Sequence, residues 1–354
     1  MTEGSPRVAV IGSGAWGTTL ALLVARSEPV TLLCHSAETA ARLQETRLNG
    51  RRLPGIELPE AIQPTADPAA LEGAELVIVA VPSSYVRATV ARLAPAIPAG
   101  ADVLSVVKGL ERGTLLRMTE VIAHAAGIDP ARVAALSGPN LALEIARGLP
   151  ASAVVAAEDP ALAERIVARL ARREFRLYTN TDVLGVELCG ALKNVIAIAA
   201  GAADGLGFGD NGKAGLMTRG LAEMMRVGIA AGANPLTFAG LAGIGDVIAT
   251  CGSKLSRNHH LGVELANGRP WAEIEAGLPG VAEGAYTVDA ALALADRFGV
   301  EMPIAREVHN ALFEGKSVRR CLIDLLARES KDELADFQAW VARLEGVSAD
   351  DADG

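Results

Sequence analysis

The sequence predicts an α/β domain over residues 1–180, followed by an all-α domain over residues 181–345. Three observations support this prediction. The chain has 354 residues, which is too many for one ordinary hydrophobic core. Up to about residue 180, short apolar runs rich in β-branched residues alternate with segments of helical periodicity. Beyond that point the strand pattern stops, and long segments rich in alanine and leucine repeat at helical spacing.

The expected strands are short, and most of them are apolar at consecutive positions. They cover residues 7–11, 29–33, 75–81, 102–107, 133–137, 151–156 and 175–179. Strands that are apolar on both faces and alternate with helices are typical of a mainly parallel sheet with helices on both sides. The small and acidic residues 346–354 predict a disordered tail.

Charge and cysteine usage exclude several classes of function. The net charge is −9, so the protein has no general attraction for nucleic acid or an anionic membrane, and an anion site must be built locally. The four cysteines lie far apart without a CxxC pair, so we expect neither a metal site nor a disulfide framework. Without a signal peptide or an uninterrupted apolar run of roughly 18 residues, we expect a cytoplasmic protein with no membrane segment.

A glycine-rich turn lies between the first expected strand and a helix. Its sequence is Gly12-Ser13-Gly14-Ala15-Trp16-Gly17, which is G-x-G-x-x-G in the context that this motif requires. Gly12 allows a tight turn, Gly14 lets the backbone approach a pyrophosphate, and Gly17 lets the helix pack on the strand. The N–H groups and the dipole of the helix N-terminus complete a phosphate site. We therefore predict a Rossmann-like domain that binds NAD(P).

The end of the second strand bears on which nicotinamide dinucleotide binds. A site for NAD(H) usually has an Asp or Glu there to hold the ribose 2′-hydroxyl, but this chain has Cys34, His35 and Ser36. His35 could contact a 2′-phosphate, and no carboxylate at these three positions would repel that phosphate. We therefore favour NADP(H), with NAD(H) as the alternative if Glu38 reaches back to the ribose.

Polar residues follow further strands, at the edge of the sheet where ligands bind in doubly wound folds. The segment Val81-Pro82-Ser83 crosses this edge near the cofactor, although Pro82 alone is merely a strand stop. Lys108 either points into the crevice or is a solvated loop lysine. The segment 137–140, Ser-Gly-Pro-Asn, leads into a helix, so its serine and asparagine are helix caps, ligand contacts or both.

The nearly apolar helix predicted over residues 187–201 contains Lys193 and Asn194 side by side. A buried lysine is costly unless it is paired, neutralised or used, whereas a lysine at a helix edge extends its amine to water. Gly190 lies one turn before Lys193 on the same face and would leave room for a ligand. The helix begins the second domain, and ligand sites are often found between domains.

Two later segments gather polar residues. Residues 205–220 have the composition of a glycine-rich loop but lack calcium-ligand spacing, so no metal is expected. Asp246 and Thr250 are four residues apart and therefore share a helix face.

A third polar segment suits a phosphate group. Ser256, Arg257 and Asn258 offer a hydroxyl, a planar guanidinium and an amide in a row. The histidines that follow, His259 and His260, diverge on a helix and have no third partner. We expect a solvated basic face there instead of a metal site.

Together these motifs resemble the bacterial type of NAD(P)-dependent glycerol-3-phosphate dehydrogenase, from residue 12 to about residue 326. The matching segments are GSGAWGT, VPS, VKGLE, SGPNLALE, ELCGALKNVIAIAAG, GDNGKAGLMTRGLAEM, GLAGIGD, TCGSKLSRN, VAEG and EMPI. The resemblance implies reversible reduction of dihydroxyacetone phosphate to sn-glycerol 3-phosphate by NAD(P)H, which supplies the glycerophospholipid backbone. It also suggests a homodimer formed through the helical domain.

The resemblance implies roles for individual residues. Lys193 is the implied general acid/base, and we add Asn194, Asp246 and Thr250 as catalytic candidates. The implied substrate contacts are Lys108, Gly138, Asn140, Lys193, Asp246, Ser256, Arg257 and Asn258. Besides Gly12, Ser13, Gly14 and Gly17, the cofactor contacts are Ala15, Trp16, His35, Lys108, Ala142, Arg257, Val281 and Glu283. Asn140 stands where many relatives are expected to have Ser or Thr, and an amide can still contact substrate.

Two other functions are open from sequence alone. One is another dehydrogenase with a Rossmann-like and a helical domain, which acts on a hydroxy acid or sugar acid and needs donors set for a carboxylate. The other is a sensor that binds NADPH without turnover. A sensor needs no acid/base group, whereas this chain concentrates Lys, Asp, Thr and Arg in its second domain.

Overall fold

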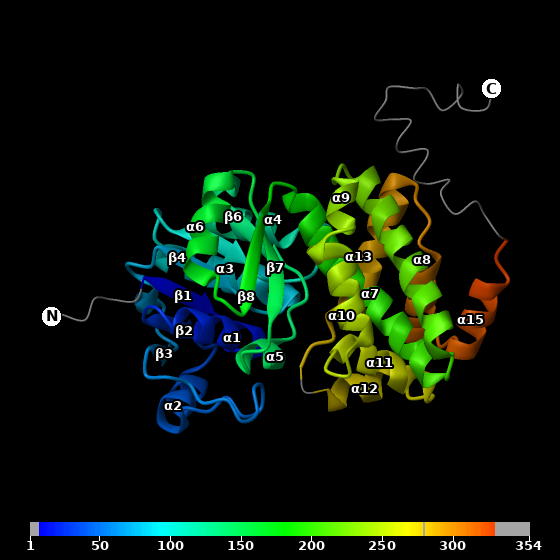
Figure 1. The fold of residues 1–354 in the computed structure, drawn as a ribbon, viewed down its shortest axis with the longest axis horizontal. Helices are drawn as coiled ribbons and strands as arrows, with labels where there is room; N and C mark the ends of the chain where they lie inside the picture. The colour runs from blue at the N-terminus through cyan, green and yellow to red at the C-terminus, as the bar shows by residue number, and fades with distance from the viewer. Residues whose placement is uncertain (1–6, 279, 330–354) are drawn as a thin grey trace, which may run out of the picture.

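The computed structural model describes residues 7–278 and 280–329. It has one half built around a β-sheet and one half built from helices, as Figure 1 shows. Helix α7 (Val183–Gly205) belongs to the helical half and contacts β6 of the sheet. The predicted disordered tail, residues 346–354, lies outside the described residues, so that prediction stays untested. The last strand ends at Asn180, and we keep the division of domains between residues 180 and 181 as a proposal.

A single eight-stranded sheet forms the first half. Its strands are β1 (Val8–Ile11), β2 (Val30–Leu33), β3 (Ile62–Thr65), β4 (Leu76–Val79), β5 (Asp102–Ser105), β6 (Val133–Ser137), β7 (Ala151–Ala156) and β8 (Phe175–Asn180). The strand order is β3-β2-β1-β4-β5-β6-β7-β8, and every pair is parallel except β6–β7. The prediction of a mainly parallel sheet is therefore confirmed.

Strand β3 was not predicted from the sequence. This strand has the sequence IQPT and pairs only with β2, where Pro64 lies opposite Leu32. Proline cannot donate to a sheet ladder and is tolerated at a sheet edge, which is where β3 lies. A proline and a glutamine in a four-residue strand leave no apolar run that could have revealed it.

Helices cover both faces of the sheet. They are α1 (Ala15–Val24), α2 (Ala37–Thr46), α3 (Val86–Leu93), α4 (Met118–Ala126), α5 (Ala142–Ala146) and α6 (Pro160–Leu170). Strand β1 shows the principle, because Val8 and Val10 pack in one hydrophobic cluster while Ala9 and Ile11 pack in another. Two-sided burial explains why these strands are apolar at every position.

The second half consists of helices around α7. They are α8 (Gly209–Ala230), α9 (Pro235–Phe238), α10 (Asp246–Gly252), α11 (Arg257–Ala266), α12 (Trp271–Gly277), α13 (Glu283–Phe298), α14 (Pro303–Phe313) and α15 (Val318–Leu326). A π-helical turn, Leu241–Gly245, leads into α10. Among the described residues beyond 180 no strand occurs, as predicted.

The prediction of a loop over residues 205–220 was wrong, because most of this segment lies in α8. Gly207 and Gly209 have positive φ and form the turn between α7 and α8. Gly220, inside α8, has another purpose: a Cβ atom there would lie 2.6 Å from Cγ2 of Ile196. Glycine thus permits close packing of α8 on α7. A prediction from composition alone interprets the same glycine as a sign of a flexible loop.

Two helical stretches of the described chain are long and apolar enough to cross a membrane by length and composition, Val183–Gly205 and Pro235–Gly252. The first has 89 % of its most apolar window buried inside the protein, as expected for a core helix. The second is interrupted by the π-helical turn and is half buried. Neither is a clear membrane span.

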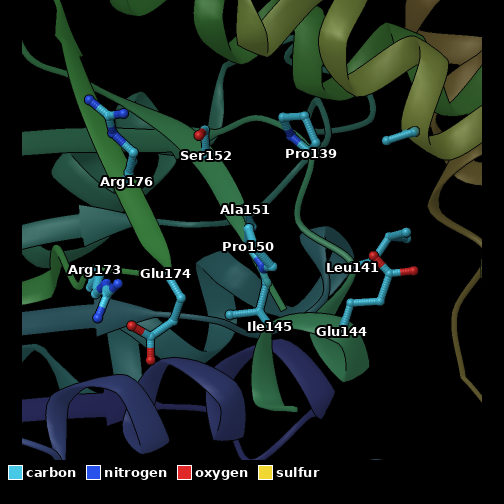
Figure 2. Close-up of a pocket in the computed structure, with 11 residues that line it drawn as sticks. Pro139, Leu141, Glu144, Ile145, Pro150, Ala151, Ser152, Arg173, Glu174 and Arg176 are labelled. Carbon is cyan, nitrogen blue, oxygen red and sulfur yellow. The ribbon is translucent and has the colours of Figure 1, made fainter. Parts of the chain in front are cut away.

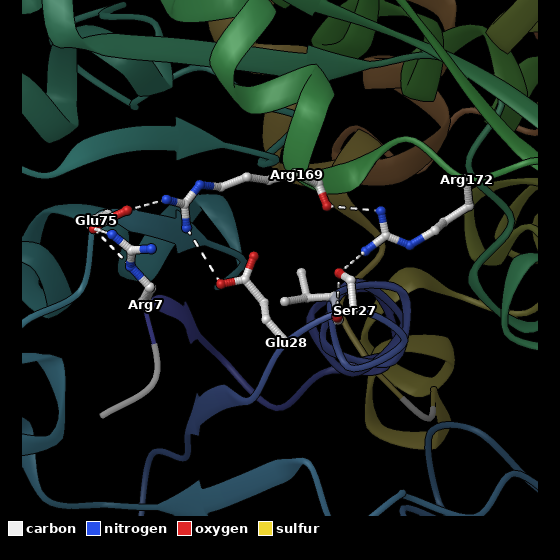
Figure 3. A network of polar contacts seen from close by, with 7 residues as sticks. Arg7, Ser27, Glu28, Glu75, Arg169 and Arg172 are labelled. Atoms are coloured by element: carbon white, nitrogen blue, oxygen red, sulfur yellow. Dashed lines mark hydrogen bonds and ion pairs between the residues drawn. The ribbon is translucent and has the colours of Figure 1, made fainter. Parts of the chain in front are cut away.

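A polar network lies at the amino-terminal ends of β1 and β4, on the side of the sheet opposite their carboxyl ends (Figure 3). Glu75, just before β4, pairs with Arg7 before β1 and with Arg169 of α6. Arg169 also approaches Glu28 at 3.5 Å, and Arg172 donates to Ser27 Oγ at 2.6 Å. Because these groups are largely at the surface, the network contributes modest stability rather than chemistry.

Candidate active site

The fingerprint glycines are required by close backbone contacts. Gly12 ends β1 with φ of 113°, and a Cβ atom there would lie 2.6 Å from the carbonyl oxygen of Ala80. A Cβ atom at Gly17 would lie 2.0 Å from the carbonyl oxygen of Gly12. Both contacts involve backbone atoms that cannot yield, so the tight turn and the close helix approach predicted from sequence are present.

Gly14 differs from the other two, because no atom of another residue lies within 4 Å of a Cβ built there. Gly14 is also the N-cap of α1, and no side chain caps that helix. The protein itself thus leaves open the space over Gly14 and the N–H groups of Ala15 and Trp16. This cradle fits the pyrophosphate of a dinucleotide, which needs N–H donors and no intruding side chain.

The end of β2 carries the residues that bear on cofactor preference. His35 is exposed, while Ser36 is the N-cap of α2 and accepts a hydrogen bond from the N–H of Thr39 at 3.2 Å. Glu38 lies exposed in the first turn of α2. No described contact commits His35 or Glu38 within the protein, so the preference for NADP(H) stays a prediction.

Four polar side chains from three segments meet at the boundary between the domains. Lys193 of α7 donates to Asp246 Oδ1 at 2.7 Å and also to the hydroxyl of Thr250. Lys108, after β5, donates to the other carboxylate oxygen, Oδ2, at 2.6 Å. Lys108 also donates to the carbonyl oxygen of Gly138 at 2.9 Å. Lys193 and Asp246 are only 5 % and 1 % exposed, so the solvated-edge alternative for Lys193 is wrong.

The cluster holds one carboxylate between two lysines. Burial raises the pKa of Asp246, but Lys108 and Lys193 outweigh that effect and hold this pKa below its usual value. Burial lowers the pKa of Lys108 to about 8, since the attraction of Asp246 only partly offsets desolvation and the repulsion of Lys193. Below a pH of about 8, Lys108 is therefore protonated and adds positive charge beside Asp246.

This charge predicts an alkaline limb in the pH profile. Lys108 loses its proton as the pH rises through about 8, and its attraction for an anionic substrate is lost with it. We expect kcat/KM to fall over this range, which initial rates at constant ionic strength would measure. A profile that stays flat to a pH of about 9.5 would contradict the assignment of Lys108 as a cationic substrate contact.

Asn194 and Asn258 form an amide ladder instead of lying free. Asn258 Nδ2 donates to Asn194 Oδ1 at 2.9 Å, and Asn258 Oδ1 accepts from the N–H of Gly284 at 3.0 Å. Asn194 Nδ2 donates to the carbonyl oxygen of Gly190 at 3.3 Å. The two amides thereby fix α7, α11 and α13 to one another, and each keeps one N–H for a ligand.

The sequence suggested that Gly190 leaves room for a ligand, and this prediction was wrong. A Cβ atom there would lie 2.7 Å from Ser137 Oγ and 3.3 Å from Lys108 Cγ. Glycine is needed so that the end of β6 and the stem of Lys108 can pack against α7. These contacts place Lys108 and Ser137 beside the turn of α7 that precedes Lys193.

The proposed phosphate contacts lie at the start of α11. Ser256 is the N-cap of that helix and accepts from the N–H of His259 at 3.2 Å. Arg257 follows with an exposed side chain, and a Cβ atom at Gly280 would lie 2.7 Å from one terminal nitrogen each of Arg257 and Arg52. Two guanidinium groups from different domains therefore converge beside Gly280.

The expected solvated basic face is wrong for His259. This residue is 7 % exposed, and its Nε2 lies 2.7 Å from Asp204 Oδ2, to which Lys213 also donates at 2.6 Å. His260 is exposed as expected. Among the described residues no group of three His, Cys, Asp or Glu side chains is arranged to hold a metal ion.

Buried polar atoms without a hydrogen-bond partner gather around this region. Among the described residues they are Trp16 Nε1, Ser137 Oγ and both amide atoms of Asn140. All three residues lie just after β1 or at the end of β6, the edge where ligands bind in such sheets. Buried polar groups are normally paired, so these orphans indicate a site completed by bound groups.

A cavity of about 330 Å³ lies directly behind the Gly138–Asn140 segment. Pro139, Leu141 and Glu144 form one side of it, and Ser152 and Arg176 stand on the neighbouring strands, as Figure 2 shows. Its lining residues include none of the candidate site residues. The cavity is therefore a neighbour of the charged cluster and no part of it.

The remaining cofactor candidates lie at or just before the starts of two helices, α5 and α13. The carbonyl oxygen of Ala142 accepts from Thr19 Oγ1 at 3.1 Å, which ties α5 to α1. Val281 and Glu283 lie half-buried at the start of α13. Glu283 accepts a hydrogen bond from Ser83, whose segment was predicted only to cross the sheet edge near the cofactor.

Comparisons with known proteins cover both halves of the chain. The model of the NAD-dependent glycerol-3-phosphate dehydrogenase N-terminus matches residues 7–163, and that of the C-terminus matches residues 182–323. The glycerol-3-phosphate dehydrogenase [NAD(P)+] of Frankia casuarinae is 47 % identical over 92 % of this chain and 98 % of its own. That of Moorella thermoacetica is also 47 % identical, over 92 % of this chain and 97 % of its own.

A solved structure agrees with these relatives. The crystal structure of glycerol-3-phosphate dehydrogenase from Coxiella burnetii superimposes with a TM-score of 0.86 and 37 % identity, covering 91 % of this chain and 98 % of that one. Because family models match both halves and relatives of 47 % identity cover nearly the whole chain, the chain belongs to the family of NAD(P)-dependent glycerol-3-phosphate dehydrogenases.

Proposed function

We propose that this protein reduces dihydroxyacetone phosphate to sn-glycerol 3-phosphate, reversibly, with NAD(P)H. The observation that carries the proposal is the buried Lys193–Asp246–Lys108 cluster. We propose that the Gly14 cradle receives the dinucleotide and that the start of α11 receives the phosphate group. A ketone that bears a phosphate ester needs those three sites together. Relatives named for this activity at 47 % identity support the same conclusion.

Lys193 is proposed to be the general acid/base. The bound nicotinamide supplies the hydride, and negative charge then develops on the ketone oxygen. An ammonium group aimed at that oxygen stabilises the charge and delivers a proton; in reverse, the neutral amine accepts it from the alcohol. Asp246 and the hydroxyl of Thr250 hold the Lys193 amine in place, and Lys108 adds a second positive charge.

Arg257, Ser256 and the spare N–H of Asn258 are proposed to hold the phosphate group. A guanidinium presents two parallel donors to a phosphate, and the N-terminus of α11 adds a favourable dipole. Asn140, whose amide atoms have no partner, is proposed to contact the substrate from the end of β6. The Gly12–Gly17 segment, Ala142, Val281 and Glu283 are proposed to hold the cofactor, with NADP(H) favoured through His35.

Location, assembly and physiological role go beyond the site. We propose a cytoplasmic homodimer that supplies glycerol 3-phosphate as the backbone of glycerophospholipids. The proposal is supported by the family to which the chain belongs and by the lack of a clear membrane span among the described residues. Sedimentation at two protein concentrations tests the dimer.

The reaction is tested with the purified chain and dihydroxyacetone phosphate as the sole ketone. We expect oxidation of NADPH, and of NADH more slowly, with glycerol 3-phosphate formed in equal amount. The reverse reaction should start from sn-glycerol 3-phosphate and NADP⁺. If the folded protein bound NADPH but did not oxidise it with any ketone tested, the proposal would be overturned in favour of a sensor.

Arg257→Lys tests the phosphate site. Lysine keeps the charge but loses the planar fork, so KM for dihydroxyacetone phosphate should rise roughly tenfold with little change in kcat. Arg269→Lys is the matched control, since Arg269 pairs with Glu264 near the far end of the same helix. An Arg257→Lys enzyme with unchanged KM would remove this residue from the phosphate site.

A further inference from the structure

Ser83 and Glu283 join the two domains by a pair of hydrogen bonds. Ser83 lies in the short helical turn after β4, and Glu283 is the first residue of α13. The N–H of Ser83 donates to Glu283 Oε1 at 3.2 Å, and its hydroxyl donates to Oε2 at 2.5 Å. One residue of the first domain thus engages both carboxylate oxygens of a residue 200 positions away in the second.

The pair lies between the dinucleotide fingerprint and Lys108. A Cβ atom at Gly12 would lie 3.1 Å from Cγ1 of Val81, so the segment that contains Ser83 leaves the sheet beside the fingerprint. A Cβ atom at Gly109, next to Lys108, would lie 2.7 Å from Ser83 Cβ and 3.7 Å from Glu283 Oε2. The glycine after Lys108 is therefore needed for the pair to form.

Glu283 is a half-buried acceptor with unused capacity. Burial raises its pKa, while the two hydrogen bonds from Ser83 and the charge of Arg257 oppose that rise. A carboxylate has about four acceptor positions, and Ser83 occupies two of them. The positions that remain suit an amide NH₂ group, which is what the nicotinamide ring of NAD(P) carries.

Glu283 is also linked, through its neighbour Gly284, to residues beside Lys193. The next residue, Gly284, donates its N–H to Asn258, which in turn donates to Asn194, the neighbour of Lys193. A Cβ atom at Gly284 would lie 2.6 Å from the carbonyl oxygen of Asn194, so the first turn of α13 has no room to shift. Holding Glu283 therefore holds this whole turn.

We propose that Ser83 is a positioning residue, which fixes the Glu283 carboxylate as an acceptor for the nicotinamide amide. This inference rests on the proposed function, because it assumes that NAD(P) extends from the fingerprint to Glu283. Ser83 acts through Glu283 and need not touch the cofactor. Without the serine hydroxyl, the carboxylate loses its strongest donor and turns toward Arg257, so the cofactor loses a partner.

The test compares Ser83→Ala with Ser84→Ala, a neighbouring serine with an exposed side chain and no described partner. NADPH binding is measured by fluorescence titration without any ketone, after thermal unfolding has verified each variant. We expect Ser83→Ala to bind NADPH about tenfold more weakly, and Ser83→Thr to restore binding. In turnover, KM for NADPH should rise while kcat changes by less than about threefold.

A second variant keeps the test decisive if Ser83→Ala unfolds. Glu283→Gln should weaken NADPH binding to a similar degree, and its effect should not add to that of a Ser83 substitution. Unchanged binding in Ser83→Ala, equal weakening in Ser84→Ala, or additive effects would each overturn the inference. Because binding needs no ketone, failure to reduce dihydroxyacetone phosphate would sink the proposed function without altering this comparison.

Discussion

Replacing Lys193 by alanine is expected to abolish nearly all turnover. The substitution removes the proposed proton donor and one positive charge from the ketone oxygen, which together predict a loss of kcat of about a thousandfold or more. NADPH binding should stay unchanged, because Lys193 lies on α7 away from the fingerprint and the Gly14 cradle. Stopped-flow and steady-state kinetics, with NADPH titration, measure both quantities.

Lys213→Ala is the matched control for this experiment. Lys213 lies in the same domain and pairs with Asp204, outside the Asp246 cluster. Its removal should change kcat by less than about twofold, as expected for a pair near the surface. If Lys193→Ala kept a kcat within tenfold of the unsubstituted protein, the assignment of the general acid/base would be wrong.

Substituting Asp246 by asparagine is expected to damage both activity and stability. Asp246 is 1 % exposed and is the shared counter-ion of Lys108 and Lys193, so its neutralisation leaves two buried amines without a negative charge. Removing one partner of a buried ion pair costs about 3–5 kcal/mol of the free energy of unfolding. We expect a loss of this order in urea denaturation, together with a kcat reduced at least about a hundredfold.

The same substitution changes the pH profile in a direction that can be worked out. The charge of Asp246 raises the pKa of Lys108, so its removal should move the alkaline limb below its starting point of about 8. Asp289→Asn is the control, because Asp289 also contacts two basic side chains, Arg112 and His309, but is 31 % exposed. An Asp246→Asn enzyme with the same limb as its parent would show that the limb belongs to another group.

The sequence predicted the parts of this fold that depend on local rules. The fingerprint could be identified because its glycine spacing, the apolar strand before it and the helix after it form one continuous stretch of sequence. Strands such as β1 and β4 stood out because burial on both faces requires apolar residues at every position. Lys193 stood out for the opposite reason, as a charged residue in a helix whose surroundings are apolar.

Other features escaped because their cause lies elsewhere in the chain. Glycines that let α8 approach α7, such as Gly220, have the same appearance in sequence as glycines that form loops. His259 was placed in solvent because nothing near it in sequence reveals Asp204, which is 55 positions away. Ser83 and Glu283 are still farther apart in sequence, and only the packing of the two domains brings them together.

The most direct test of the account is substrate selection by the intact protein. NADPH oxidation should be compared for dihydroxyacetone phosphate, dihydroxyacetone and a small 2-oxo acid under identical conditions. The account predicts a kcat/KM for the phosphate ester at least about a thousandfold above the other two, because Arg257 and the Lys108–Lys193 pair are arranged for an anionic ester. Equal turnover of dihydroxyacetone, or preference for the 2-oxo acid, would contradict it.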